Sequence, residues 1–344
     1  MPDTRSAPAP TGAPSAPGPA DVARARRRLA GRVQRTPLVR SDQLDALCGA
    51  RLWLKAENLQ RGGSFKVRGA LLAVEELAAA GSRGVLAQST GNHAIAVALA
   101  ARAHRLPTLI VLPSDAPPAK VGRIREAGAR VVFAGTTLAE RVARVAELRV
   151  RHGYDVVDPY ENPYVVAGQG TASAELLEQA ADEGVALDSL VVPIGGGSAL
   201  AGACLAAAGH GTAVLGAEPA AVPAFTAALR AGGPVTVPAR HTLADGLRPD
   251  RIGDLPYSLA SPVARVLTVS EEDIADALRT ALLTARLLVE PAAATALAGA
   301  LAHAAGAGRG TDIGVLLSGG NVEPALVATL LAGAVEAPRV AVAS

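Results

Sequence analysis

The chain has 344 residues, a formal net charge of +2 and two cysteines; half of its residues are hydrophobic, yet only 2% are aromatic. The near-neutral charge excludes an obvious polyanion binder, and two cysteines exclude a disulfide framework. Neither Cys48 nor Cys204 stands at zinc-ligand spacing from a histidine, so we expect two small buried apolar residues in a reduced, intracellular protein. The core must be built from Ala, Val and Leu, in one large domain or two linked ones.

The first 20 residues are rich in Pro, Ala and Ser and lack the apolar segment of a signal peptide. Residues 1–20 are therefore expected to be a disordered tail, and residues 336–344 a second tail. Apolar stretches such as Ala94 to Ala101 end well before the roughly 20 residues that a bilayer requires, so we expect a cytoplasmic protein without membrane contact. The segment Arg24 to Arg28 predicts a solvated helix face and no nucleic-acid site.

From Asp21 onward, short β-like runs alternate with Ala- and Leu-rich helical runs. This alternation predicts an α/β fold with mostly parallel sheets, in which ligands bind beyond the carboxyl ends of the strands. Glycines and small polar residues are concentrated at those ends. Strands are expected over 84–88, 107–112, 130–133, 154–157, 189–194, 213–216 and 313–317, helices over 94–103, 119–127 and 138–149, and about one further helix after Asn321.

A lysine stands in the segment Glu57 to Gly69, ENLQRGGSFKVRG. Lys66 is one of only three lysines among 33 basic residues, since arginine supplies the rest. Lysine can lose its proton and form a Schiff base with a carbonyl group, whereas a guanidinium practically cannot. Lys66 is therefore a candidate nucleophile; the alternative is a surface lysine that escaped the bias toward arginine.

Three loops with small or glycine residues follow predicted strands: Ser89 to His93, Gly195 to Ser198, and Ser318 to Asn321. Free N–H groups at a helix start, or in consecutive glycines, suit a carboxylate or phosphate. The glycine run is neither a Walker loop nor the dinucleotide GxGxxG pattern. The alternatives are an ordinary N-cap in the first loop and tight turns in the other two.

Seven segments occur together in one order: SFKVRGA, STGNHA, GQGT, VPIGGG, ADG, VEP and SGGN. In this order and approximate spacing the chain, from about Arg35 to Asn321, resembles the pyridoxal-phosphate-dependent threonine/serine dehydratases, a fold type II family related to serine racemase. The resemblance implies a two-domain α/β fold with the cofactor in the cleft between the domains. We expect a large domain of residues 21–69 and 158–335 and a small domain of residues 70–157.

The resemblance also implies roles for individual residues. Lys66 would form the Schiff base with pyridoxal phosphate and later take the α-proton. Phe65 would pack beside the cofactor, Asn92 would bond its ring hydroxyl oxygen, and Ser318 would pair with its pyridine nitrogen. The phosphate would be held by backbone amides of Gly195, Gly196, Gly197 and Ser198, and the substrate carboxylate by the loop of Ser89, Thr90, Gly91, Asn92 and His93.

Glu290, in VEP, is expected to reach the cofactor cleft, with a structural ion pair as the alternative; Asp245, in ADG, is similar. For His93, a role in orienting its loop is favoured over proton transfer. Ser198 replaces the usual fourth glycine of the phosphate loop, which leaves its amide able to donate. Glu218 fits the first ligand of a divalent cation site, but position 224 is Ala224 where an acidic residue is usual, so we expect no metal and a capping or ion-pair role for Glu218.

These features predict β-elimination of a β-hydroxy amino acid of the L-threonine or L-serine type, giving a 2-oxo acid and ammonia. Thr90 stands where serine racemases carry a serine, so racemisation is an alternative, as is a lyase acting on hydroxyaspartate or phenylserine. A non-catalytic protein that binds a cofactor or metabolite is the alternative of another class. The family further implies a homodimer.

Overall fold

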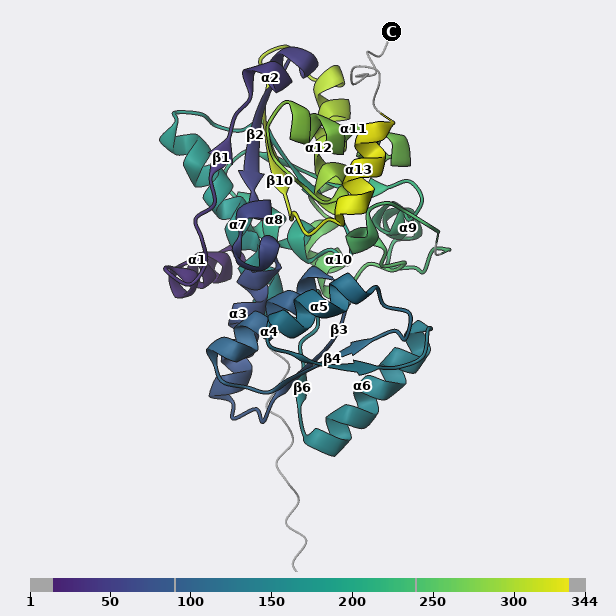
Figure 1. The fold of residues 1–344 in the computed structure, drawn as a ribbon. Helices are drawn as coiled ribbons and strands as arrows, with labels where there is room; N and C mark the ends of the chain where they lie inside the picture. The colour runs from purple at the N-terminus through teal and green to yellow at the C-terminus, as the bar shows by residue number, and fades with distance from the viewer. Residues whose placement is uncertain (1–14, 90, 239, 334–344) are drawn as a thin grey trace, which may run out of the picture.

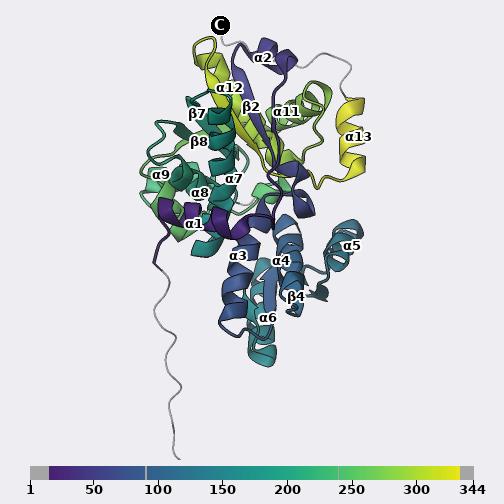
Figure 2. The same cartoon turned by 90° about the vertical axis from the view of Figure 1, so that its left-hand side faces the viewer.

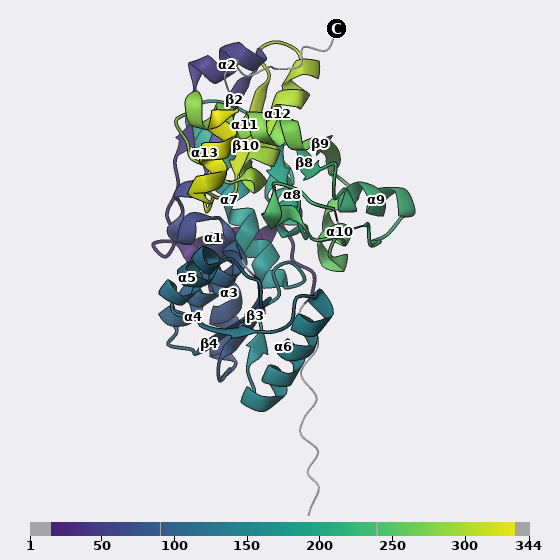
Figure 3. The same ribbon diagram turned by 45° about the vertical axis from the view of Figure 1, so that its right-hand side comes forward.

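The computed structural model describes residues 15–89, 91–238 and 240–333, which build two sheets in separate lobes (Figures 1 and 3). The larger sheet has six strands in the order β1-β2-β10-β7-β8-β9. All its neighbours are parallel except the short pair β1 and β2. Its strands are β1 (Leu38–Val39), β2 (Arg51–Ala56), β7 (Ser189–Pro193), β8 (Ala213–Pro219), β9 (Arg265–Val269) and β10 (Asp312–Leu317).

The smaller sheet has four parallel strands in the order β5-β4-β3-β6. It occupies the lower lobe of Figure 1, with α6 packed beside it. Its strands all fall within residues 70–157, the range expected for the small domain, while every strand of the larger sheet falls outside that range. These strands are β3 (Val85–Gln88), β4 (Thr108–Leu112), β5 (Arg130–Phe133) and β6 (Asp155–Val156).

Helices separate the strands along the chain and cover both sheets. The early ones are α1 (Pro19–Leu29), α2 (Asp42–Cys48), α3 (Lys66–Ala79), α4 (Asn92–Ala103), α5 (Pro118–Glu126), α6 (Leu138–His152) and α7 (Pro163–Asp182). The later ones are α8 (Ser198–Ala207), α9 (Ala224–Ala231), α10 (Asp254–Ala260), α11 (Glu271–Leu283), α12 (Pro291–Gly306) and α13 (Pro324–Ala332). The short 3-10 turns are η1 (Glu57–Leu59), η2 (Arg61–Gly63) and η3 (Asp245–Leu247).

The prediction of an α/β fold with parallel-rich sheets is confirmed, and several limits differ from those expected. α1 begins at Pro19, so the last two residues of the expected tail are helical; Pro fits the first turn of a helix, where no intrahelical donor is needed. Residues 1–14 and 336–344 lie outside the described part of the chain. Helix α3 runs without a break across the expected domain limit at residue 69/70, so that limit stays a prediction.

Small apolar side chains fill the interior, as the composition predicts. Helix α12 packs on strands of the larger sheet and is buried along most of its length; its buried residues are mainly alanines, together with Leu297 and Gly299. Helices α3 and α4 bury Ala- and Val-rich faces against β3 and β4. Within the described residues no helix is long and apolar enough to cross a bilayer.

The segment GQGT lies on α7, where its glycines let three helices approach closely. A Cβ atom at Gly168 would lie 2.6 Å from the Cα of Gly69 on α3. A Cβ atom at Gly170 would lie 2.7 Å from the carbonyl oxygen of Gly202 on α8. Helix α7 therefore contacts both α3 and α8 backbone to backbone, and Figure 2 shows α1 lying across the ends of this helix group.

Candidate active site

The motif loops converge because each follows the carboxyl end of a parallel strand or begins a helix there. Lys66 is the first residue of α3, and its Nζ lies 3.4 Å from the Oγ of Ser198, the first residue of α8. The amide of Phe65 donates to the carbonyl of Ser318 over 3.0 Å, and Ser64 bridges to Gly319. Segments 132 residues apart in the sequence thus meet around the Lys66 amine.

The amine of Lys66 is changed by its surroundings. Burial of the ammonium group lowers the pKa of Lys66 from 10.5 to about 8, although Asp158 and Glu290 act in the opposite direction. The ring of Phe65 lies 5.0 Å from Nζ and adds apolar surface beside it. With this pKa, Lys66 loses its proton and becomes the nucleophilic free amine at a pH more than two units lower than an ordinary lysine does.

The glycine-rich loop after β7 leaves no room for side chains. A Cβ atom at Gly196 would overlap the ring of Tyr160, and one at Gly197 would lie 2.6 Å from Ile252. Gly197 also has φ of +101°, in the left-handed region that favours glycine. Helix α8 begins directly afterwards with no side-chain cap, so its first N–H groups stay available to an anion. The loop therefore fits a phosphate group held by backbone amides.

The side chain of Asn92 connects the small lobe to the large one. Its Nδ2 donates to Oε1 of Glu290 over 2.7 Å, and its Oδ1 accepts from Nδ2 of Asn321 over 2.8 Å. Asn321 in turn donates to the carbonyl of Gly62 over 2.8 Å. The STGNHA, VEP and SGGN segments therefore share one hydrogen-bonded chain beside Lys66.

Glu290 is a buried carboxyl group without a close cationic partner among the described residues. Burial, and then the nearby Asp245, raise the pKa of Glu290 to about 8, against the hydrogen bond from Asn92 and the charges of Lys120 and Lys66. Among the described residues Glu290 forms a hydrogen bond with Asn92 and no ion pair, and its contact with the cofactor stays a prediction.

His93 is buried in the first turn of α4 and does not titrate near neutral pH. Its Nε2 hydrogen-bonds with the carbonyl of Val157, at the end of β6, over 2.8 Å. Burial, followed by the charge of Lys66, lowers the pKa of His93 to about 4. A neutral ring that joins α4 to the segment after β6 has the geometry of a loop-orienting residue.

The rest of the loop before α4 is organised by Ser89, whose Oγ accepts from the amide of Gly91 over 3.2 Å. Gly91 is the N-cap position of α4, again without a side-chain cap. Thr90, expected to touch substrate, lies outside the described residues. The first turn of α4 thus offers N–H donors that no side chain caps.

Glu218, considered above as a remnant of a metal site, has a structural role. Its two carboxylate oxygens accept from the amides of Phe225 and Thr226, both over 2.9 Å, at the start of α9. These are the orphan donors of a helix N-terminus, so Glu218 caps α9 from β8. Among the described residues, no group of three metal-ligating side chains gathers around it or elsewhere.

Sequence analysis assigned no role to three residues that the structure places at the site. Asp158 acts on the charge of Lys66, Tyr160 packs on the glycine-rich loop, and Asn321 links Asn92 to Gly62. Asn321 is the last residue of the SGGN segment, so that motif could have indicated its place in the site. Asp158 and Tyr160 lie in a segment without a motif, and only the folded chain places them near Lys66.

Comparison with known proteins supports this arrangement. Residues 29–319 match the model of a family described as pyridoxal-phosphate dependent enzyme. An L-threo-3-hydroxyaspartate ammonia-lyase from Saccharomyces cerevisiae is 36% identical over 324 residues, which are 93% of this chain and 98% of that protein. A protein of the same name from a Pseudomonas species is 39% identical over 317 residues, 91% of this chain and 98% of that protein.

Solved structures give the same result. The crystal structure of a threonine deaminase from T.th. superposes with a TM-score of 0.84 and 40% identity, over 89% of this chain and 99% of that one. The structure of maize serine racemase superposes with a TM-score of 0.86 and 33% identity, over 93% of this chain and 98% of that one. The predicted family, fold type and cofactor are therefore confirmed: the chain belongs to the family of pyridoxal-phosphate-dependent enzymes, in its fold type II branch.

Proposed function

We propose that the protein is an ammonia-lyase that eliminates water from a β-hydroxy amino acid of the L-threonine or L-serine type, giving a 2-oxo acid and ammonia. The observation that carries this proposal is the Lys66 amine, with its lowered pKa, 3.4 Å from Ser198 on the phosphate-binding loop. Ammonia-lyases among the most similar relatives support it.

The residues that hold the cofactor are assigned from their positions. Backbone amides of Gly195, Gly196, Gly197 and Ser198 would hold its phosphate, and Lys66 would hold its aldehyde carbon as a Schiff base. Ser318, Asn92, Glu290 and Phe65 would contact its ring. When bound, pyridoxal phosphate supplies the electron sink that makes the α-proton of an amino acid acidic.

The remaining steps belong to side chains of this chain. Lys66, once freed as an amine, takes the α-proton of the substrate as general base. The loop of Ser89, Thr90, Gly91, Asn92 and His93 would bind the substrate carboxylate, aided by the N–H donors and the positive end of the dipole of α4, which begins at Asn92. Ser318 would pair with the pyridine nitrogen of the bound cofactor; because a hydroxyl group is neutral, it would not enforce a proton on that nitrogen, which would favour loss of the β-hydroxyl group over other outcomes.

The side chain of the substrate is the open part of this proposal. L-threo-3-hydroxyaspartate is the second candidate, because two relatives with that name are matched over nearly their whole length. We would measure ammonia and 2-oxo acid release from L-threonine, L-serine, L-threo-3-hydroxyaspartate and phenylserine, with Lys66→Ala as blank. Release from at least one of these by the wild type alone is expected; a holoenzyme that releases ammonia from none of them contradicts the proposal.

Racemisation is a second candidate activity, favoured by relatives named serine racemase at 34% and 36% identity. The hydroxyl group of Thr90 would return a proton to the face opposite Lys66. The variant Thr90→Ala separates the two activities: lost racemisation of L-serine with retained elimination supports a racemase role. Equal racemisation in the variant and the wild type would remove Thr90 from that role.

The proposal also covers the oligomeric state, the cellular location and the domain limits. The protein acts as a homodimer in the cytoplasm, as the family resemblance and the two free cysteines suggest. Its small domain spans about residues 70–157, and its large domain residues 21–69 and 158–335, with the cofactor between them. Size-exclusion chromatography with light scattering tests the dimer; a monomer at micromolar concentration contradicts it.

A further inference from the structure

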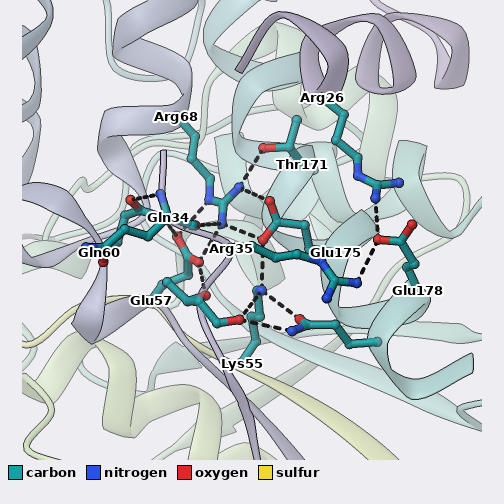
Figure 4. Close-up of polar contacts among 12 residues, drawn as sticks. Arg26, Gln34, Arg35, Lys55, Glu57, Gln60, Arg68, Thr171, Glu175 and Glu178 are labelled. Carbon is teal, nitrogen blue, oxygen red and sulfur yellow. Dashed lines mark hydrogen bonds and ion pairs between the residues drawn. The ribbon is translucent and has the colours of Figure 1, made fainter. Parts of the chain in front are cut away.

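A group of buried charges surrounds the side chain of Arg68 in the first turn of α3 (Figure 4). We call it the α3 charge cluster; it consists of Lys55, Glu57, Arg68, Thr171 and Glu175. Arg68 stands two residues after Lys66 in the same helical turn, and its side chain is fully buried. Two cations and two carboxylates make the cluster neutral as a whole.

Arg68 contacts both carboxylates in a geometry that a guanidinium alone provides. Its Nε and Nη2 donate to the two oxygens of Glu57 over 2.8 and 2.7 Å. Its Nη1 and Nη2 donate to the two oxygens of Glu175, both over 2.8 Å. A further bond of 3.2 Å reaches Oγ1 of Thr171, the threonine of the GQGT segment. Two bidentate pairs fix the direction of a side chain as well as its position.

The cluster ties the start of α3 to three other elements. Glu57 belongs to η1, and Glu175 and Thr171 belong to α7. Lys55, on β2, donates to Glu175 over 2.8 Å and to the carbonyl of Thr36 over 2.8 Å. The position of Arg68 is therefore set by β2, η1 and α7 together.

Backbone contacts hold the same helical turn from the other sides. Gly69 lies against Gly168 of α7: a Cβ atom at Gly168 would lie 2.6 Å from the Cα of Gly69. Phe65 donates from its amide to Ser318. Lys66 lies between these contacts, so its backbone cannot shift without breaking one of them.

We propose that the α3 charge cluster positions Lys66: Arg68, clamped between Glu57 and Glu175, holds the first turn of α3 at the angle that aims the Lys66 amine at the glycine-rich loop. This inference rests on the proposed role of Lys66 and goes beyond it, because it gives a catalytic consequence to Arg68 and to the GQGT threonine. Arg68 is a positioning residue, because its guanidinium bonds Glu57, Thr171 and Glu175 and acts on Lys66 only through the helix they share.

The test is the variant Arg68→Lys, which keeps the charge but can bond only one of the two carboxylates at a time. Cofactor-free protein is mixed with pyridoxal phosphate, and the rate of Schiff-base formation is followed by absorbance. Binding of pyridoxine 5'-phosphate, which has no aldehyde, is measured in parallel. We expect Schiff-base formation to slow by about tenfold while binding of this analogue changes by less than about twofold, because only the aim of the amine is altered.

Arg35→Lys is the matched control. Arg35 lines the same surface cavity of about 560 Å³ as Arg68, but it pairs with Glu178 and Asp182 at the surface. The variant Arg35→Lys is expected to leave the rate of Schiff-base formation unchanged.

Thr171→Val is the second variant, to be used if Arg68→Lys does not fold. It removes one hydrogen bond of Arg68 and keeps the shape of the side chain, and we expect it to slow Schiff-base formation by about threefold.

Wild-type rates in Arg68→Lys, or in Thr171→Val if it is used, would overturn the inference. An equal loss of analogue binding and Schiff-base formation would also overturn it, because it would show general disruption of the site. A wild-type protein that forms no Schiff base at all would instead refute the proposed function.

Discussion

Lys66 owes its lowered pKa to its place in the fold. An ordinary lysine is almost wholly protonated at neutral pH, whereas burial lowers the pKa of Lys66 to about 8. Nearby Asp158 and Glu290 keep the pKa from falling further. The sequence singled out this lysine through its rarity and its motif, but the shift depends on burial and on Asp158, which no pattern in the sequence indicates.

This pKa predicts how the reaction of the cofactor-free protein with pyridoxal phosphate depends on pH. The fraction trapped at Lys66 after brief exposure and borohydride reduction rises with pH through a midpoint near 8, because only the free amine attacks. Peptide mass spectrometry measures it, with Lys66→Ala as the blank. A midpoint of about 10 or above, the range of an ordinary lysine, would contradict the buried environment of the amine.

His93 makes the protein less stable in acid. The unfolded chain takes up a proton near pH 6.5, but the folded chain only near pH 4, because burial disfavours the charged ring. The free energy of unfolding therefore falls as the pH falls from about 6.5 to about 4, by up to about 3 kcal/mol. Urea unfolding at several pH values measures this slope.

The variant His93→Asn isolates the effect of the imidazole from that of other titrating groups. The variant is less stable than the wild type at pH 7, since the contact with Val157 is changed, but its stability falls less steeply toward acid. Identical slopes in both proteins would show that folding leaves the pKa of His93 unchanged, and would contradict its lowered pKa.

Elements with an uninterrupted apolar pattern were predictable, and elements defined by long-range contacts were not. Strands β4 and β10 lie within one residue of their predicted limits, because each is a run of β-branched and leucine residues. Strand β2 was missed. It contains Lys55, a charge that can be buried there only because Glu175 of α7 binds it. A partner 120 residues away leaves no periodic signal.

The close contact between α3 and α7 predicts a strong effect of one methyl group. In Gly168→Ala the new Cβ atom would lie 2.6 Å from the Cα of Gly69, so the helices must move apart. We expect the free energy of unfolding to fall by about 1–3 kcal/mol, the usual range for overpacking. The midpoint of urea unfolding measures this loss.

Gly122→Ala is the matched control for this substitution. Gly122 lies within α5, and a Cβ atom there would meet nothing within 4 Å. Alanine has the higher helix propensity, so this variant should be as stable as the wild type or more stable by up to about 1 kcal/mol. Equal stabilities of Gly168→Ala and Gly122→Ala would contradict the tight packing of α7 on α3.

On the scale of the whole molecule, the site is assembled from both lobes. Asn92 of the small lobe bonds Glu290 and Asn321 of the large lobe, and Lys120 of α5 pairs with Asp245 of η3. Motif order along the chain predicted which segments approach one another, because the family resemblance already implies the fold; the roles of the individual residues stay a prediction. It could not predict how these residues bond one another, since each bond joins segments that the sequence separates widely.

The measurement that tests the account most directly is the visible absorption spectrum of the purified protein before and after addition of L-threonine or L-threo-3-hydroxyaspartate. We predict a Schiff-base band that is absent from Lys66→Ala and that shifts when substrate is added, together with the release of 2-oxo acid. A protein that shows no such band even after pyridoxal phosphate is supplied would contradict the central claim that Lys66 is the catalytic amine.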